Sequence, residues 1–194
     1  MIWVGRSFSS PECQAEEEGI FAYDLNPENG EMTKLGKIPP CEEGTNALDC
    51  EPHAIELPDG RFLCHIRVQE YKREKVFTIY QSKSTDGGKT WTAPVPLLER
   101  CGGAPPHILQ HSSGTLISVY GRREMPYGIR AMFSRDGGET WDTENILYEN
   151  TVSDDLGYPA TVELSDHSLL TVFYAHPEEG TPAVIMQQKW AFEE

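Results

Sequence analysis

The sequence has few positive charges and few cysteines. Of its 194 residues, 16 are Lys or Arg and 31 are Asp or Glu, which gives a formal net charge of −15 at pH 7. Binding to nucleic acid is not expected of so acidic a chain, because phosphate contacts need clustered Lys and Arg. The 5 cysteines are odd in number, widely spaced and without a CxxC pair. With no His at ligand spacing, they do not predict a zinc site.

Long apolar runs are also missing. No stretch approaches the roughly 20 apolar residues that a membrane-spanning helix requires, so no membrane association is expected. Met1 leads directly into IWVGRSF, without the basic start and apolar core of a signal peptide. Together with the cysteine usage, this predicts a cytoplasmic protein with reduced thiols as the sequence stands. A natural start further upstream would leave secretion open.

An eight-residue pattern, S-x-D-G-G-x-T-W, occurs twice in the sequence. It begins at Ser84 and again at Ser134, a period of 50 residues. The paired glycines allow the positive φ angles of a tight turn, and the Asp side chain can accept hydrogen bonds from turn amides. Only one carboxylate precedes the glycines, so we expect a structural turn and no metal. A period of this size indicates stacked supersecondary units.

A second repeat surrounds the first. The segments 52–60, 106–114 and 159–167 each read as strand, tight turn, strand with alternating apolar positions. Where a third strand, the Asp-containing turn and a fourth strand follow, the unit has the strand content of a propeller blade. We therefore predict an all-β chain forming one domain over 1–194, with blades at about 1–40 (incomplete), 51–101, 102–150 and 151–192.

In such blades, the start of the first strand, the end of the second and the start of the third lie on one face. Polar and aromatic residues gather at these positions, including several of the few arginines. The sequence therefore predicts a cationic pocket inside an acidic protein. The residues at these positions are Glu51, Pro52, His53, Arg67, Gln69, Pro106, His107, Arg122, Arg123, Arg130, Tyr158, Tyr174 and His176.

S-x-D-x-G-x-T-W is the Asp-box, or BNR, repeat, and from about residue 50 to its end the chain resembles the C-terminal half of the sialidase (neuraminidase) superfamily. The resemblance implies a six-bladed β-propeller, here partial, with about three to four blades of four-stranded antiparallel sheet. It implies no metal and no cofactor. A homodimer that closes the half-propeller is one way to complete the ring.

The resemblance also implies roles for individual residues. The sialidase pattern E-x4-E-L-x-D-G is matched from Glu51 to Gly60, which makes Glu51 the base that activates a nucleophile, Tyr158. Arg67 would bind the substrate carboxylate together with Arg130 or Arg122, between which the alignment does not choose. His107 is a further candidate for substrate binding. It shares its repeat position with His53, however, and a common structural role is the alternative.

Through these residues the resemblance implies a sialidase-like glycoside hydrolase, which hydrolyses terminal sialic acid or a related acidic sugar with retention. Only part of that active site is expected in this chain. The family's first arginine motif and its acid/base Asp, both from early blades, have no counterpart here, and Tyr174 is followed by Ala175 where the family tends to have Glu. The alternative is a non-catalytic BNR propeller module that binds carbohydrate or protein through the same arginines.

Overall fold

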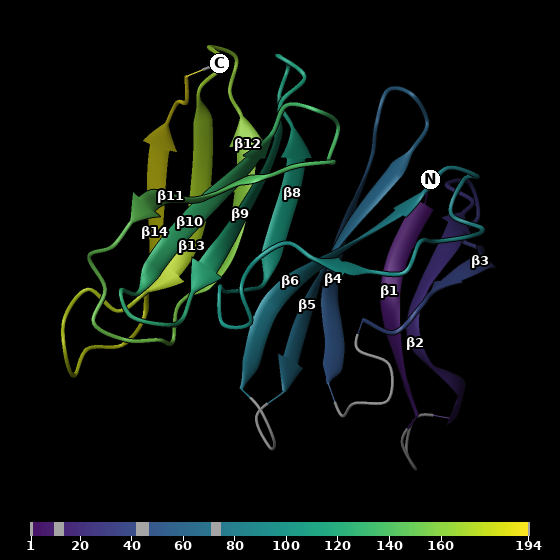
Figure 1. Ribbon diagram of the computed structural model, residues 1–194, viewed down its shortest axis with the longest axis horizontal. Coiled ribbons are helices and arrows are strands. Elements are labelled where there is room, and N and C mark those ends of the chain that lie inside the picture. Colours follow the sequence, from purple (N-terminus) through teal and green to yellow (C-terminus); the bar gives the residue numbers. More distant parts are fainter. Residues whose placement is uncertain (1, 10–13, 42–46, 71–74, 194) are drawn as a thin grey trace.

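The computed structural model describes residues 2–9, 14–41, 47–70 and 75–193, and the chain there consists of strands, turns and loops (Figure 1). The strands are β1 (Ile2–Ser9), β2 (Gln14–Leu25), β3 (Met32–Ile38), β4 (Leu48–Glu56), β5 (Phe62–Glu70), β6 (Val76–Ser84), β7 (Val95–Pro96), β8 (Pro106–Gln110), β9 (Leu116–Arg122), β10 (Gly128–Ser134), β11 (Asp142–Tyr148), β12 (Gly157–Glu163), β13 (Leu169–Ala175) and β14 (Val184–Trp190). Within the described ranges there is no helix of the length and apolarity that crossing a bilayer demands. Cys13 lies outside the described residues.

The strands form four antiparallel sheets, each built from consecutive segments of the chain. The first sheet has the order β1-β2-β3, the second β4-β5-β6-β7, the third β8-β9-β10-β11 and the fourth β12-β13-β14. They follow one another from the purple N-terminal sheet to the yellow C-terminal sheet (Figure 1). Strand β1 contacts β4, β4 contacts β8, and β8 contacts β12. This arrangement confirms the all-β class and the antiparallel sheets that the repeats predict.

Each Asp-containing box closes the turn that follows the third strand of its sheet. In the first copy, Asp86 accepts hydrogen bonds from the Thr90 amide (2.9 Å) and the Thr90 hydroxyl (2.7 Å). The Ser84 hydroxyl donates to Asp86 (2.9 Å) and accepts from the amide of Gly88 (3.0 Å). Gly87 and Gly88 have φ angles of 75° and 83°. The same bonds recur around Asp136, so the box is a self-contained hydrogen-bonded turn.

The Trp that ends each box packs against the preceding sheet. Trp91 joins an apolar cluster with Ile20 and Ile38 of the first sheet. Trp141 packs over the second sheet, where its indole Nε1 donates to the side-chain oxygen of Gln81 (3.2 Å). Neighbouring sheets are therefore joined by the same residue of the repeat.

A buried polar network adds to the contact between the second and third sheets. His65 is fully buried, and its Nδ1 lies 3.0 Å from the Ser118 hydroxyl and its Nε2 3.2 Å from the Gln81 side-chain oxygen. The Gln81 amide group donates in turn to the carbonyl of Gly138 (2.8 Å). Burial lowers the pKa of His65 to about 3. The ring is therefore neutral at physiological pH.

A second set of histidines connects β4, β8 and β12. The Nδ1 of His53 accepts a hydrogen bond from the amide of Ile108 (3.1 Å), and the Nδ1 of His107 accepts one from the amide of Thr161 (3.4 Å). The two rings stack with centroids 4.4 Å apart. Burial lowers the pKa of His53 and, with a smaller contribution from His53, lowers that of His107 to about 4. Each neutral ring joins its own sheet to the backbone of the next.

Candidate functional site

Three residues that are far apart in the sequence meet where β4, β5 and β12 approach one another. The Tyr158 hydroxyl donates to one carboxylate oxygen of Glu51 at 2.6 Å. The Arg67 guanidinium donates from one nitrogen to the other Glu51 oxygen (2.7 Å) and to the Tyr158 hydroxyl (3.3 Å). A phenol between a carboxylate and a guanidinium has a proton acceptor and a positive charge at the same oxygen. We call these residues the Tyr158 cluster.

The backbone at two members of this cluster is unusual. Glu51 and Tyr158 both have a φ of 48°, in the left-handed region that favours glycine. Each sits where the strand register shifts, between Cys50 and His53 in one case and between Gly157 and Ala160 in the other. Such a conformation costs on the order of 1–3 kcal/mol for a non-glycine residue and tends to occur at functional sites. Two equivalent strained positions therefore direct their side chains toward each other.

Arg67 is held from several sides. The residue is 8% exposed, and its guanidinium lies over the ring of Phe77, 4.8 Å from the ring centre. It also donates to the side-chain oxygen of Gln69. Its Nε is buried and has no hydrogen-bond partner in the described part of the chain. The hydrogen bond and the charge of Glu51 oppose the lowering effect of burial, so the pKa of Arg67 is raised and the group is a fixed cation.

Tyr158 is half exposed, at 51%, while its hydroxyl is engaged by the cluster. Burial of the ring and then the hydrogen bond to Glu51 raise the pKa of Tyr158, and Arg67 opposes them. The phenol therefore keeps its proton at neutral pH. Glu51 is placed to accept that proton when the oxygen reacts, as a general base does.

A second arginine, Arg123, approaches the cluster from the third sheet. Its guanidinium lies over the rings of Phe77 (5.4 Å) and Tyr158 (6.0 Å), and it donates to the hydroxyl of Tyr174 (3.2 Å). Its Nε donates to the carbonyl of Leu156 (3.0 Å). The sequence places Arg123 on the correct face but gives no reason to prefer it. The signal that could have identified Arg123 is its position one residue beyond the end of β9, because successive side chains along a strand alternate between its two faces.

A small hollow adjoins Arg123 on this side of the molecule. It measures about 90 Å³, and its lining residues are Lys75, Phe77, Arg123, Glu124 and Asp154. Arg67 of the Tyr158 cluster and Arg123 both lie over Phe77, which lines this hollow. The next hydroxyl, that of Tyr174, donates to Asp155 (2.6 Å), and burial followed by this bond raises the pKa of Tyr174 to about 12.

The other predicted site residues lie elsewhere. Arg130 on β10 is 2% exposed and donates to Glu149 (2.5 Å) and to the carbonyls of Tyr148 and Pro126, both at 3.3 Å. It stabilises the β10–β11 region and makes no described contact with the Tyr158 cluster. Arg122 lines a separate hollow of about 380 Å³ with Glu99 and Thr143. His107 uses its Nδ1 to bind the Thr161 amide.

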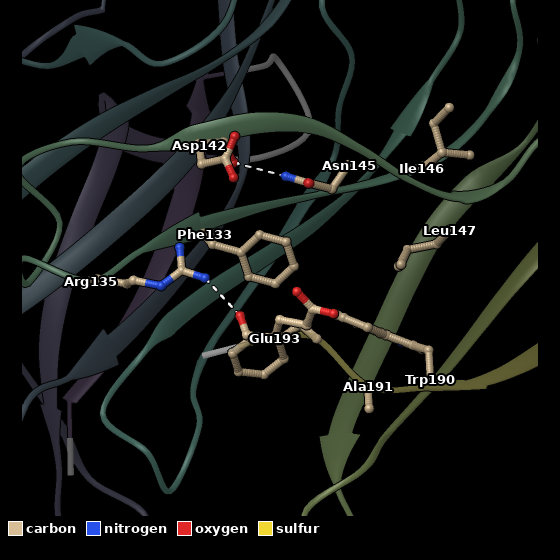
Figure 2. Close-up of a pocket in the computed structure, with 10 residues that line it drawn as sticks. Phe133, Arg135, Asp142, Asn145, Ile146, Leu147, Trp190, Ala191 and Glu193 are labelled. Carbon is tan, nitrogen blue, oxygen red and sulfur yellow. Dashed lines mark hydrogen bonds between the residues drawn. The ribbon is translucent and has the colours of Figure 1, made fainter.

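A hollow of about 320 Å³ lies at the opposite end of the fourth sheet, between β11 and the C-terminal segment (Figure 2). Phe133 and Trp190 contribute to its wall, with ring centres 6.2 Å apart. Arg135 points toward the segment and donates to the Glu193 carbonyl (2.9 Å). Arg135, which lines this hollow, thus holds the C-terminal segment in place. Trp190 pairs with Leu169 and Tyr174 with Ile185, so the length of β13 separates this hollow from the Tyr158 cluster.

The structure offers no evident metal centre in the ranges that it describes. There, no group of three or more His, Cys, Asp or Glu side chains is arranged to hold a metal ion. The side chains of the Tyr158 cluster can themselves support proton transfer, nucleophilic attack by a phenol and binding of anions by guanidinium groups.

Comparison with known proteins gives a family and a fold. The family described as BNR repeat-like domain matches residues 11–172. Among curated proteins, none matches the sequence. A protein of unknown function from Dyadobacter fermentans superposes with a TM-score of 0.76 at 22% identity, covering 97% of this chain and 49% of that one.

Two enzymes of known structure share the fold at lower identity. The α-L-arabinanase of Penicillium chrysogenum, solved with arabinobiose, has a TM-score of 0.59 at 19% identity and covers 73% of this chain and 46% of its own. The Hadza microbial sialidase Hz136 has a TM-score of 0.64 at 14% identity, and the superposition covers 88% of this chain and 38% of that one. This chain thus spans about half the length of these structures, or less. At such identities the likeness shows the fold alone.

Proposed function

The chain belongs to the BNR repeat-like domain family, and on that premise we propose that it carries part of the active site of a retaining glycoside hydrolase. The substrate class is a glycan with a terminal acidic sugar, such as an α-linked sialic acid. The observation that carries this proposal is the 2.6 Å hydrogen bond from the Tyr158 hydroxyl to Glu51, two residues 107 positions apart in the sequence.

The cluster supports a two-step reaction. In the first step the Tyr158 oxygen attacks the anomeric carbon, its proton passes to Glu51, and the glycosidic bond breaks. The departing oxygen takes a proton from a general acid or from water. In the second step the base left by that protonation, the deprotonated general acid or hydroxide, takes a proton from a water molecule as its oxygen attacks the same carbon. The bond to Tyr158 breaks, and Glu51 returns its proton to the phenolate oxygen. The two displacements retain the configuration, as in other double-displacement glycosidases.

A neutral nucleophile suits an acidic sugar. A carboxylate beside the anomeric carbon would repel an attacking Asp or Glu, whereas the phenol of Tyr158 carries no charge before it reacts. Arg67 and Arg123 are the cations that would bind that carboxylate by charge-assisted hydrogen bonds. In this proposal Arg123 takes the part that the sequence assigned to Arg122 or Arg130, because it is the arginine that reaches the Tyr158 ring.

The test is to compare turnover and binding in the Tyr158→Phe variant. Turnover is measured with an aryl α-sialoside, and binding with free N-acetylneuraminic acid by saturation-transfer NMR. We expect the variant to lose turnover and retain binding, since the ring and both arginines remain. Glu51→Gln should reduce kcat by about 10²–10⁴-fold, the usual contribution of a general base.

Tyr148→Phe is the matched control. Tyr148 lies on β11, and its hydroxyl donates to the carbonyl of Asn150 rather than to the cluster. It should leave both turnover and binding unchanged. Equal loss of turnover and binding in Tyr158→Phe would overturn the assignment of Tyr158 as nucleophile.

The second candidate function is binding of an acidic sugar without turnover. The raised pKa of Tyr158 favours it, because a protonated phenol is a good hydrogen-bond partner and a poor nucleophile. This candidate predicts no turnover in the unchanged chain, with binding that persists in Tyr158→Phe and is lost in Arg67→Met. Turnover that depends on Tyr158 would exclude it.

A further inference from the structure

Arg123 is held by two acceptors that come from separate elements. Its Nε donates to the carbonyl of Leu156 (3.0 Å), and its Nη2 donates to the hydroxyl of Tyr174 on β13 (3.2 Å). Both acceptors are uncharged oxygens. Arg67, by contrast, donates directly to the carboxylate of Glu51. Arg123 is therefore held in place by contacts that do not neutralise its charge.

A carboxylate stands behind the Tyr174 hydroxyl. That hydroxyl donates its proton to Oδ1 of Asp155 (2.6 Å), so its oxygen presents lone pairs to Arg123. A hydroxyl that donates to a carboxylate is polarised and becomes a better acceptor. The hydrogen bond from Tyr174 and then the contacts with His176 lower the pKa of Asp155, so this group is a carboxylate at neutral pH.

His176 holds the other oxygen of that carboxylate. Its Nε2 lies 3.3 Å from Oδ2 of Asp155, and its Nδ1 lies 2.9 Å from the carbonyl of Thr181. Both oxygens can only accept, so both contacts are hydrogen bonds when the ring carries two protons. The Thr181 carbonyl and, with a smaller contribution, Asp155 raise the pKa of His176. The carboxylate is thus fixed from two sides.

The segment that carries Asp155 also supplies the other acceptor, the carbonyl of Leu156. This segment is tied to the end of β13, because the amide of Val152 donates to the carbonyl of His176 (3.0 Å). The side chain of Leu156 is fully buried. The two hydrogen bonds that hold Arg123 therefore depend on the same anchored segment.

We propose that Asp155 and Tyr174 are positioning residues that direct the guanidinium of Arg123 at the carboxylate of the acidic sugar. The identity of this ligand rests on the proposed function. Tyr174 stacks on Tyr158 with ring centres 6.1 Å apart, so the guanidinium is fixed beside the ring of the proposed nucleophile. A guanidinium oriented in advance loses less side-chain entropy when it binds a carboxylate.

The first test separates the charge of the ligand from its shape. Tyr174→Phe removes the hydroxyl and keeps the ring. Its affinity for N-acetylneuraminic acid and for the methyl ester of that acid is measured by saturation-transfer NMR titration. We expect the Kd of the acid to rise by about three- to tenfold and the Kd of the ester to stay the same, because the ester has no carboxylate. Tyr148→Phe, whose lost hydroxyl faces the carbonyl of Asn150, should change neither value.

Asp155→Ala tests the second positioning residue. A carboxylate that were only a nearby charge would repel the acid, and its removal would tighten binding. Positioning through Tyr174 predicts the opposite, a weaker affinity for the acid. Asp166→Ala is the matched control, because Asp166 is also an exposed carboxylate but pairs with Lys189 (2.7 Å). It should not weaken the binding of the acid.

A second measurement needs no sugar. NMR of chain labelled with ¹⁵N-arginine gives the rate of rotation about the Nε–Cζ bond of Arg123, which hydrogen bonds at Nε and Nη2 slow down. We expect this rate to rise severalfold in Tyr174→Phe and in Asp155→Ala. The two control variants should keep the rate of the unchanged chain.

Three results would overturn the inference. They are an unchanged rotation rate in Tyr174→Phe, an equal loss of affinity for acid and ester in that variant, and tighter binding of the acid to Asp155→Ala. An unchanged chain that binds neither ligand would contradict the proposed function instead. The rotation rates would then still decide whether Asp155 and Tyr174 position Arg123.

Discussion

The buried His65 should make the stability of this protein depend on pH between about 6.5 and 3. Its pKa falls from 6.5 to about 3 on folding because the ring is removed from water. Within that window the unfolded state binds the proton and the folded state does not. The free energy of unfolding therefore rises with pH through this window. The stability that the neutral His65 contributes is lost as the pH falls below 6.5.

The magnitude follows from these two values. One pKa unit corresponds to about 1.36 kcal/mol, so lowering the pH from 7.5 to 5.0 should remove about 2 kcal/mol through His65 alone. His107, whose pKa is lowered to about 4, contributes in the same direction. A loss of this size is a large part of the 5–15 kcal/mol that holds a typical domain folded.

The assay is urea unfolding at pH 7.5 and pH 5.0 of the unchanged chain and of His65→Gln. At pH 7.5 the variant should be less stable by about 1–2 kcal/mol, the cost of weakened hydrogen bonds to Ser118 and Gln81. When the pH is lowered from 7.5 to 5.0, the free energy of unfolding of the variant relative to that of the unchanged chain should increase by about 2 kcal/mol, because glutamine does not titrate.

Ser118→Ala is the control for this comparison. It removes the hydroxyl 3.0 Å from His65 but keeps the titrating ring. The stability that this variant loses relative to the unchanged chain should therefore change far less with pH. A difference between the unchanged chain and His65→Gln that is the same at both pH values would refute the reasoning. It would mean that the ring is hydrated or already charged in the folded state.

Further predictions concern single positions. Gly36→Ala should destabilise the chain by about 1–3 kcal/mol in urea unfolding, because a Cβ there would lie 2.3 Å from the Lys89 carbonyl oxygen; unchanged stability would contradict this packing. Asp136→Ala should lower the melting temperature by removing the hydrogen bonds that hold the second box, and circular dichroism melting measures it. Tyr158→Phe should change stability by no more than about 1.5 kcal/mol, since a larger loss would make Tyr158 a structural residue.

Much of the fold follows from the sequence because it is repeated. The box beginning at Ser84 and its copy at Ser134 predict two identical turns. The repeated segments 52–60, 106–114 and 159–167 predict pairs of strands joined by a tight turn. These patterns are local, and the backbone obeys them: the hydrogen bonds of Asp86 recur at Asp136. The sequence gives no comparable sign of the His65 network, whose members come from two sheets.

The arrangement of the candidate site was predictable in part for the same reason, while the roles of its residues remain proposals. Tyr158, Glu51 and Arg67 stand at strand ends that the repeat assigns to one face, and the structure brings them together. The second arginine could not be chosen. Arg130, which the sequence favoured with Arg122, is buried beside Glu149, whereas Arg123 reaches the Tyr158 ring. Which arginine faces the Tyr158 cluster depends on side-chain direction at the end of β9, and the repeat does not determine it.

The left-handed backbone at Glu51 and Tyr158 has a consequence for how this chain can change. Glycine and asparagine tolerate that conformation better than glutamate or tyrosine do, so at these two positions the residues best suited to the backbone are not those present. A library of variants selected only for thermal resistance should therefore accumulate glycine or asparagine at both. A library selected for sugar turnover should retain the original pair, and the divergence between the two populations would report what the strain is kept for.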